Sequence, residues 1–393
     1  MKQIILFLSI AVTTISVNAQ SKKKDHMYTV KPFTINVQQT VLDDLQHRLR
    51  NTRWPDAPAN IGWQYGTDPV FLQSLVAYWQ NGYDWRKQEA ALNKFPQFTV
   101  EIDSVTIHFL HIKSKSSNAK PLLLLHGWPD CFYRYIKVIP LLTDYDLVIP
   151  SIPGFGFSGH VAKTDDGSAK IFATLMKDVL GYDTFFSAGG DIGQGITKSL
   201  ANLYPENVPA IHLSDVGYPN GSEDWSKMSK AEQEFGQIIQ QWWFKEGAYS
   251  LLHATKPQTQ AYGLNDSPAG LAAWIIEKFN SWRTQEDGIE NHFTKDELLT
   301  NIMIYWVTQT INSSMRSYAV DNAQELASAR KVNTPTGVAI FPGDAPTPKE
   351  WAERRVNVKR FSKMEKGGHF AALETPELWA KEVDTFFKEQ LTK

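Results

Sequence analysis

The chain has 393 residues, of which 42% are hydrophobic and 21% are charged, so it is long enough to bury a large core. Its formal net charge of −2 gives no electrostatic footprint for nucleic acid or for an anionic membrane surface. The composition therefore excludes these two partners and favours small neutral ligands.

The first 19 residues are predicted to be a secretory signal. A basic start at Lys2 is followed by an apolar run over 4–12 and by the small-residue stretch 17–19. No later segment approaches the roughly 20 apolar residues that a membrane span needs. The single cysteine, Cys131, cannot form an internal disulfide. We therefore expect an exported protein, periplasmic or secreted, that is stable through its core alone and has no membrane span in the mature chain.

Amphipathic helices precede the first strand signal. Apolar residues recur at helical spacing in three stretches, which are 41–49, 71–79 and 85–92. Residues 98–111 then alternate as a β-hairpin that turns at Asp103 and Ser104. This order predicts an N-terminal wrapping segment over 28–115, added to a fold whose core begins later.

From residue 116 onward, short apolar runs alternate with helical stretches. The runs have the length of buried strands and lie at 122–125, 147–152, 185–188, 210–213, 338–341 and 356–361. Such alternation predicts an α/β fold with a mostly parallel sheet and helices on both faces.

Between residues 218 and 334 the strand signal disappears, and aromatic-rich helical stretches follow one another. One of them is expected to run over 298–311. We interpret 218–334 as a helical cap inserted between two parts of the sheet domain, 116–217 and 335–393. Insertions at the carboxyl ends of the strands lie where ligands bind in open α/β sheets.

The stretch 187–194 has the pattern of a nucleophile elbow. It runs from an apolar strand through small residues to Asp191, and then through Gly193 into a helix. Glycines on both sides remove the Cβ atoms that would collide in the strained strand-to-helix turn of the α/β-hydrolase fold. Because the exposed residue is an aspartate and not a serine, the pattern indicates displacement at saturated carbon through an alkyl ester. A plain Gly-Gly-Asp turn is the alternative interpretation.

Two other segments bring chemistry to the same edge of the sheet. Trp128 lies in the motif His-Gly-Trp-Pro, directly after the buried strand 122–125. Its backbone amide and that of Ile192 are expected to form an oxyanion hole. His369 lies near the C-terminus, in the chain order of nucleophile, acid and histidine that α/β-hydrolases use, and is the expected base.

The acid that should support His369 has three candidates. Asp344 follows the expected strand 338–341 and a Pro-Gly turn, so it is our assignment. Asp215 is the runner-up, because it follows another strand whose end lies near the same site. Glu374 is better explained as a charge near a helix N-terminus.

These motifs closely resemble the epoxide hydrolases of the microsomal and juvenile-hormone type over nearly the whole mature chain. The segments that carry the resemblance are 53–56, 82–86, 126–129, 150–158, 187–194 and 264–271. The resemblance implies Asp191 as nucleophile, His369 as base and Asp344 as charge-relay acid. It also implies that Tyr249 and Tyr318 of the cap bind the epoxide oxygen.

One departure from the family concerns the residue after the nucleophile. Relatives usually carry tryptophan where this chain has Ile192, so the pocket wall is expected to be reshaped, while the backbone amide keeps its role. A haloalkane dehalogenase, which is the nearest alternative, commonly uses that tryptophan to hold the leaving halide, and isoleucine cannot do so. A non-catalytic binding protein on the same fold is the second alternative, but it would not require a complete nucleophile, base and acid.

We therefore expect an exported enzyme that converts a small apolar epoxide and water into a vicinal diol. No cofactor and no metal are expected. The resemblance implies roles such as detoxification or aromatic hydrocarbon catabolism. A homo-oligomer is compatible with the sequence.

Overall fold

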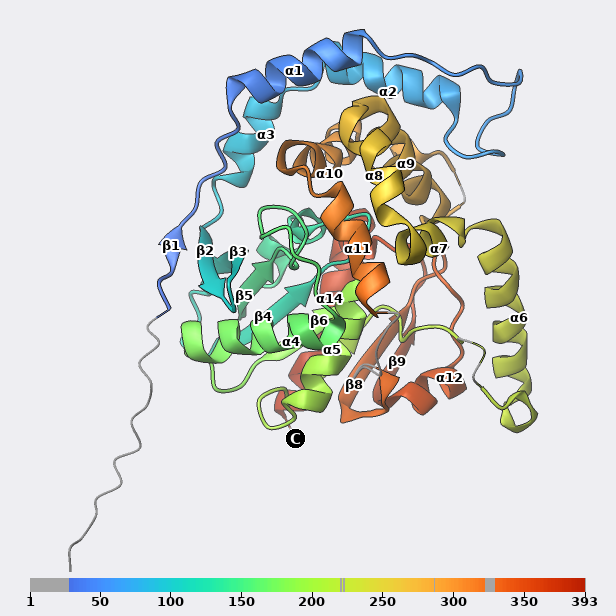
Figure 1. Ribbon diagram of the computed structural model, residues 1–393. Helices are drawn as coiled ribbons and strands as arrows, with labels where there is room; N and C mark the ends of the chain where they lie inside the picture. Colours follow the sequence, from blue (N-terminus) through green and yellow to red (C-terminus); the bar gives the residue numbers. More distant parts are fainter. Residues whose placement is uncertain (1–27, 220, 222, 286, 322–328, 393) are drawn as a thin grey trace, which may run out of the picture.

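The computed structural model describes residues 28–219, 221, 223–285, 287–321 and 329–392 (Figure 1). The predicted signal over residues 1–19 lies outside these ranges. Within them the strands are β1 (Lys31–Pro32), β2 (Gln97–Ile102), β3 (Val105–Ile112), β4 (Lys120–Leu125), β5 (Tyr145–Pro150), β6 (Phe186–Gly189), β7 (Ile211–Leu213), β8 (Val332–Ile340) and β9 (Val356–Lys363).

The strands form one sheet in the order β1-β2-β3-β5-β4-β6-β7-β8-β9. The pairs β1 with β2, β2 with β3 and β3 with β5 are antiparallel, whereas every pair from β5 to β9 is parallel. The predicted α/β-hydrolase fold with a mostly parallel sheet is confirmed.

Helices cover both faces of the sheet, because successive side chains of β6 contact different helices. The Phe186 ring stacks on Phe387 of α14 (Pro376–Leu391), with ring centroids 4.5 Å apart. The next residue, Ser187, points the other way, and its hydroxyl lies 3.1 Å from that of Thr197 in α5 (Ile192–Leu203). Successive side chains of a strand face opposite sides, so α5 and α14 lie on opposite faces. Further core helices are α4 (Asp165–Thr174), α12 (Lys349–Arg355) and α13 (Ala371–Glu374).

The expected hairpin is formed by β2 and β3. Asp103 and Ser104 have φ values of 50° and 62°, as a two-residue hairpin turn requires. The edge strand β1 was not expected, because two residues are too short to show an alternating pattern.

The N-terminal helices are α1 (Gln39–Arg50), α2 (Pro69–Asn81) and α3 (Trp85–Leu92). Figure 1 shows α1 and α2 lying across the cap helices, on the side away from the sheet. The Tyr78 hydroxyl donates a hydrogen bond of 2.7 Å to Asp296 of the cap, and the Tyr83 hydroxyl lies 3.1 Å from that of Thr300. The wrapping segment therefore ties the cap to the edge of the sheet that β1, β2 and β3 form.

The cap is a run of helices between β7 and β8 (Figure 1). Its main helices are α6 (Lys230–Lys245), α7 (Ala248–Thr255), α8 (Pro257–Asp266), α9 (Pro268–Ser281), α10 (Lys295–Thr308) and α11 (Ile311–Asp321). The insertion follows the carboxyl end of β7, so these helices are placed above the edge at which the parallel strands end.

Two expected elements differ from the structure. The stretch 298–311 is not one helix, because Gln309 adopts a left-handed conformation with a φ of 54° and separates α10 from α11. The strand expected over 338–341 begins earlier, at Val332, with a register shift before Pro335. Asn333, Thr334 and Pro335 interrupt the apolar run, which hides the first half of β8 from a hydrophobicity pattern.

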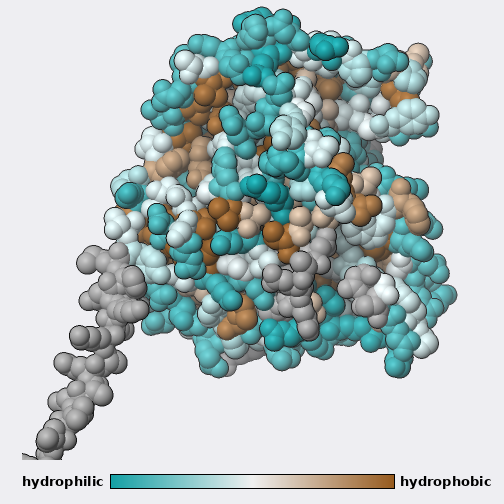
Figure 2. Space-filling view, viewed as in Figure 1, coloured by the Kyte–Doolittle hydropathy of each residue, from teal (hydrophilic) through white to brown (hydrophobic). Residues whose placement is uncertain are grey.

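Figure 2 shows a largely hydrophilic face on which apolar residues occur in small, scattered groups. Scattered apolar side chains are normal on a protein surface. Across the described ranges, no helix is both long enough and apolar enough to cross a membrane.

Candidate active site

Asp191 stands at a strained turn between β6 and α5. Its φ of 56° and ψ of −131° lie outside the regions that a side chain with a Cβ atom favours. A Cβ atom on Gly189 would come within 2.4 Å of the Gly193 carbonyl oxygen, and one on Gly193 would come within 2.1 Å of the Leu125 carbonyl oxygen. Glycine is therefore required on both sides of the aspartate, as in the elbow pattern.

Asp215 holds this turn through hydrogen bonds to backbone amides. Its Oδ2 atom accepts a hydrogen bond of 2.7 Å from the Asp191 amide, and its Oδ1 atom accepts one of 3.2 Å from the Gly217 amide. Burial raises the pKa of Asp215 to about 6, and the charge of Asp344 adds to the rise. The structure thus places the runner-up acid under the nucleophile's backbone and not against the histidine.

His369 lies between two carboxylates. Its Nδ1 atom is 3.0 Å from Asp344 Oδ2, and its Nε2 atom is 3.6 Å from Asp191 Oδ2. Burial alone would lower the pKa of His369, but the charge of Asp344, its hydrogen bond and the charge of Asp191 outweigh burial and raise the pKa. In the same way, His369 outweighs the effect of burial on Asp344 and lowers the pKa of that carboxyl. The sequence-predicted nucleophile, base and acid are therefore brought together.

The loop that carries His369 is held by two residues to which the sequence analysis gave no such function. Arg134 donates a hydrogen bond of 2.9 Å to the His369 carbonyl oxygen and forms a buried ion pair with Asp130. Asp130 in turn accepts a hydrogen bond of 3.0 Å from the Gly127 amide. Only the spacing of four residues between Asp130 and Arg134 could have pointed to their pairing.

Glu374 lies two residues before the start of α14, near a helix N-terminus as expected, and also binds the loop that carries His369. Its carboxylate accepts hydrogen bonds from the Gly368 amide at 2.8 Å and from the Thr284 amide at 3.2 Å. It also lies 2.8 Å from His292 Nδ1. Glu374 therefore joins the histidine loop to the cap.

The two oxygens of Asp191 have different neighbours. Oδ1 accepts a hydrogen bond of 2.8 Å from the Trp128 amide, whereas Oδ2 faces His369. A Cβ atom on Gly127 would come within 2.2 Å of Oδ1, so the loop can approach this closely only with glycine at that position. Ile192 is the first residue of α5, where backbone amides have no acceptor within the helix. Both amides of the expected oxyanion hole are thus at the nucleophile.

The two cap tyrosines come from different helices and meet above Trp128. Tyr249 lies on α7 and Tyr318 on α11, with ring centroids 6.1 Å apart. The Trp128 ring stacks on Tyr249 at 5.2 Å and meets Tyr318 edge-on at 6.2 Å. The Tyr318 hydroxyl is buried and makes no hydrogen bond of normal geometry with the described residues, but it is near enough to the Tyr249 hydroxyl for each to shift the pKa of the other.

Burial raises the pKa of both tyrosines well above its usual value, and the negative charge of Asp191 contributes to the rise. Both hydroxyls therefore keep their protons at neutral pH and can donate hydrogen bonds.

A cavity of about 260 Å³ brings these groups to a common space. Asp191, His369, Asp344 and Tyr249 line it, and Tyr318 lies beside Tyr249. The rest of the described lining is mainly apolar and consists of Tyr218, Ile238, Ile239, Trp242, Trp282, Ala345 and Pro346. Such a lining suits an uncharged ligand with one polar reacting centre.

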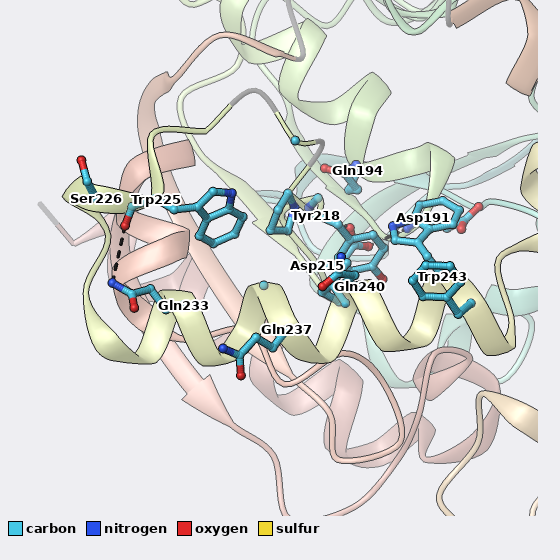
Figure 3. Close-up of a pocket in the computed structure, with 16 residues that line it drawn as sticks. Asp191, Gln194, Asp215, Tyr218, Trp225, Ser226, Gln233, Gln237, Gln240 and Trp243 are labelled. Carbon is cyan, nitrogen blue, oxygen red and sulfur yellow. Dashed lines mark hydrogen bonds between the residues drawn. The ribbon is translucent and has the colours of Figure 1, made fainter.

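A second, larger cleft of about 1250 Å³ also reaches Asp191 (Figure 3). It runs beside α6, whose Gln237, Gln240 and Trp243 line it. Of the described residues that line this cleft, only Asp191 and Asp215 are charged. The described lining of neither cavity includes Ile192.

Comparisons with known proteins show the family of this chain. The epoxide hydrolase N terminus matches residues 30–135, and the alpha/beta hydrolase fold matches residues 120–262. Epoxide hydrolase 1 of Sus scrofa is 36% identical, over 91% of this chain and 88% of that protein. Juvenile hormone epoxide hydrolase 2 of Ctenocephalides felis is also 36% identical, over 90% of this chain and 84% of that protein.

Among solved structures, the crystal structure of juvenile hormone epoxide hydrolase from the silkworm Bombyx mori has a TM-score of 0.83 and 30% identity. The match covers 93% of this chain and 95% of that one. The resemblance that the motifs predicted is confirmed, and this chain belongs to the epoxide hydrolases.

Proposed function

We propose that this enzyme hydrolyses an apolar epoxide to a vicinal diol in two steps, through an ester on Asp191. One observation carries the proposal, which is that the two oxygens of the Asp191 carboxylate differ. Oδ1 accepts a hydrogen bond of 2.8 Å from the Trp128 amide, whereas Oδ2 faces His369 Nε2 at 3.6 Å. The held oxygen can become the carbonyl oxygen of an ester, and the free oxygen can act as the nucleophile.

In the first step, Oδ2 of Asp191 attacks a carbon of the epoxide ring. The ring C–O bond breaks, and its electron pair goes to the ring oxygen. An alkoxide is a poor leaving group, so this oxygen needs a hydrogen-bond or proton donor as the bond breaks. Tyr249 and Tyr318 supply the donors, since their hydroxyls are neutral and place no charge in the apolar cavity.

In the second step, His369 takes a proton from water at Nε2, and the hydroxide adds to Cγ of Asp191. The negative charge that develops on Oδ1 is stabilised by the amides of Trp128 and Ile192. The bond between Cγ and Oδ2 then breaks as protonated His369 returns its proton to Oδ2, so the diol leaves with Oδ2 and the aspartate keeps the oxygen of the water. The second proton of that water is released from the new carboxyl group and replaces the one that the tyrosines gave to the ring oxygen. Asp344 orients the imidazole and stabilises its protonated form.

The cavity supports an uncharged substrate, and its indole and phenol rings favour an aryl or other flat apolar group beside the epoxide. Roles in detoxification or aromatic hydrocarbon catabolism fit such a substrate. For location, we propose export, supported by the basic, apolar and small-residue stretches of residues 1–19.

The test is to stop the reaction after the first step. His369→Gln should open the epoxide once and then accumulate the ester, because the base is needed only for the second step. Intact-protein mass spectrometry should show an adduct with the mass of the substrate, and peptide mapping should place it on Asp191. Aryl, fatty and terpenoid epoxides would be compared, with haloalkanes as the control substrates.

The matched control is the double variant Asp191→Ala with His369→Gln, which should show no adduct. An unmodified His369→Gln protein that still binds substrate would indicate direct attack of water on the epoxide. An adduct on another residue would remove Asp191 as nucleophile. Turnover of haloalkanes in place of epoxides would overturn the proposed reaction.

A further inference from the structure

Lys278 is a buried cation behind the wall of the active-site cavity. It lies on α9, is 5% exposed, and its ammonium is 4.8 Å from the centre of the Tyr249 ring. The same ammonium is 2.6 Å from Glu277 Oε2 and 3.5 Å from Glu246 Oε2. Lysine is almost never fully buried unless it is paired, so the two carboxylates explain how the charge is tolerated. They do not explain why it lies over a phenol ring.

The Tyr249 ring is fixed by its neighbours on several sides. Trp128 stacks on it nearly parallel, at 10° and 5.2 Å, and Trp282 lies 5.3 Å away. The ammonium of Lys278 is also 5.7 Å from the Trp282 ring, which in turn lies 5.1 Å from His369. Lys278 thus contacts two rings of the cavity wall without lining the cavity itself.

Tyr318, the second tyrosine, shares one neighbour with Tyr249. His253 lies 5.1 Å from the Tyr318 ring and 5.5 Å from the Tyr249 ring, and burial, with the charge of Lys278, lowers the pKa of His253 to about 3, so this imidazole is neutral at working pH. Among the described residues, no lysine or arginine lies over the Tyr318 ring, although one lies over that of Tyr249. The two donors are therefore electrostatically unequal.

We propose that Lys278 is a positioning residue for epoxide opening, which acts through Tyr249. A cation over an aromatic face is attracted to the ring, and the attraction grows as the ring gains electron density. The Tyr249 ring gains density when its hydroxyl gives up part of its proton to the ring oxygen of the epoxide. The ammonium would then hold Tyr249 in place and stabilise it most in the transition state, making it the stronger of the two donors.

Glu246 acts on Tyr249 in the opposite sense to Lys278. Its charge contributes to the raised pKa of Tyr249, after burial, Asp191 and Asp344. When Lys278 is replaced by a neutral residue, Glu246 and Glu277 stay beside the ring without their partner. Tyr249 should then become a weaker donor, while the second step, which uses His369 and the oxyanion amides, should change little.

The proposal rests on the proposed role of Tyr249, so the test must separate the two. The rate of ester formation would be measured by rapid quenching and mass spectrometry in the His369→Gln background, with an aryl epoxide. Lys278→Met should slow ester formation about tenfold or more, and Lys278→Arg should restore most of the rate. In enzyme that retains His369, the rate of ester hydrolysis should stay within about twofold. Lys388→Met, which loses an exposed ion pair on α14, is the charge control.

A double-mutant cycle separates an action through Tyr249 from a merely structural role of Lys278. Lys278→Met should slow ester formation in the Tyr318→Phe background at least as much as in the parent, because Tyr318 can no longer cover for a weakened Tyr249, and should have almost no further effect in the Tyr249→Phe background. Equal slowing in both backgrounds would mean that Lys278 only stabilises the cap, and would overturn the inference. Lys278→Gln, which can still hydrogen-bond to the two carboxylates, replaces the methionine variant if the latter does not fold.

Failure of the proposed role of Tyr249 would give a different result in the same experiments. If Tyr249→Phe forms the ester at the parent rate, the assignment of Tyr249 as a donor is wrong, and the inference about Lys278 is overturned with it. If Tyr249→Phe is slow and Lys278→Met is not, only the inference about Lys278 is overturned.

Discussion

The backbone amide of Asp191 donates a hydrogen bond of 2.7 Å to the carboxylate of Asp215. Asp344, on the neighbouring strand end, lies 3.0 Å from His369. The two acids that compete in the sequence for one role therefore have two roles in the structure. One supports the strained backbone of the nucleophile, and the other orients the base.

This division predicts different effects for the two matched variants. Asp344→Asn should lower the rate of ester hydrolysis by a factor on the order of 10³ to 10⁴, because His369 loses the partner that sets its tautomer and stabilises its protonated form. Asp215→Asn should have a smaller effect on turnover, since the side-chain oxygen of asparagine can still accept the hydrogen bond from the backbone N–H of Asp191. Single-turnover hydrolysis and thermal unfolding of both variants would check this. Greater loss of turnover in Asp215→Asn would reverse the assignment.

The pH dependence of the second step should differ from the titration of the free enzyme. In the free enzyme, burial and Arg134 lower the pKa of His369, while Asp344 and Asp191 raise it, and the sum is a raised pKa. Ester formation neutralises Asp191 and removes one of the two raising charges, so the pKa of His369 should fall in the intermediate.

His369 acts as a base only in its neutral form, which dominates above its pKa. We therefore expect ester hydrolysis to increase with pH, with a midpoint below the imidazole pKa of the free enzyme. NMR titration of the free imidazole and single-turnover hydrolysis over the same pH range would give the two midpoints. A hydrolysis midpoint at or above the free value would contradict the proposed effect of the Asp191 charge.

The sequence was sufficient for those parts of the site whose geometry is local. The elbow around Asp191 depends on neighbouring glycines and on the strand and helix that flank it, so its pattern is contiguous. Chain order could not decide between Asp344 and Asp215, because both residues follow a strand of the same sheet and lie between Asp191 and His369. The choice of Asp344 depended on the Pro-Gly turn before it and on the family resemblance.

The supporting contacts could not be predicted, because their partners are far apart in the chain. Arg134 binds the carbonyl group of a residue 235 positions away. Lys278 lies over Tyr249 only because α9 and α7 pack together in the cap, and helical periodicity does not show which helices will meet. The roles of Tyr249 and Tyr318 came from family resemblance alone, since aromatic residues in a helical cap are more often part of its core.

The two tyrosines should act on the first step and partly substitute for one another. Tyr249→Phe and Tyr318→Phe should each slow ester formation, and the double variant should be slowed by more than the product of the two effects, because one donor can partly cover for the loss of the other. Rapid-quench measurement of adduct formation in the His369→Gln background would show this. Normal ester formation in the double variant would remove both residues from the mechanism.

The last prediction concerns the close approach of the oxyanion loop to the nucleophile. Gly127→Ala would place a Cβ atom within 2.2 Å of Asp191 Oδ1 in the present geometry, so either the loop or the carboxylate must move. Because the Trp128 amide binds that same oxygen, the movement should break the hydrogen bond that holds Oδ1. We expect both chemical steps to slow, by a factor on the order of 10² or more, as for loss of an oxyanion donor.

Gly263→Ala is the matched control for this change. Gly263 lies inside α8, and a Cβ atom there would have no atom within 4 Å apart from the adjoining backbone of its own helix. Alanine is the better helix former by roughly 0.5 to 1 kcal/mol, so this variant should keep its turnover and unfold at the same or a higher temperature. Turnover with an aryl epoxide and thermal unfolding would be measured for both variants. If Gly127→Ala keeps the parent rate and stability, the loop has room to spare, and the hydrogen bond from Trp128 to Asp191 does not depend on glycine at position 127.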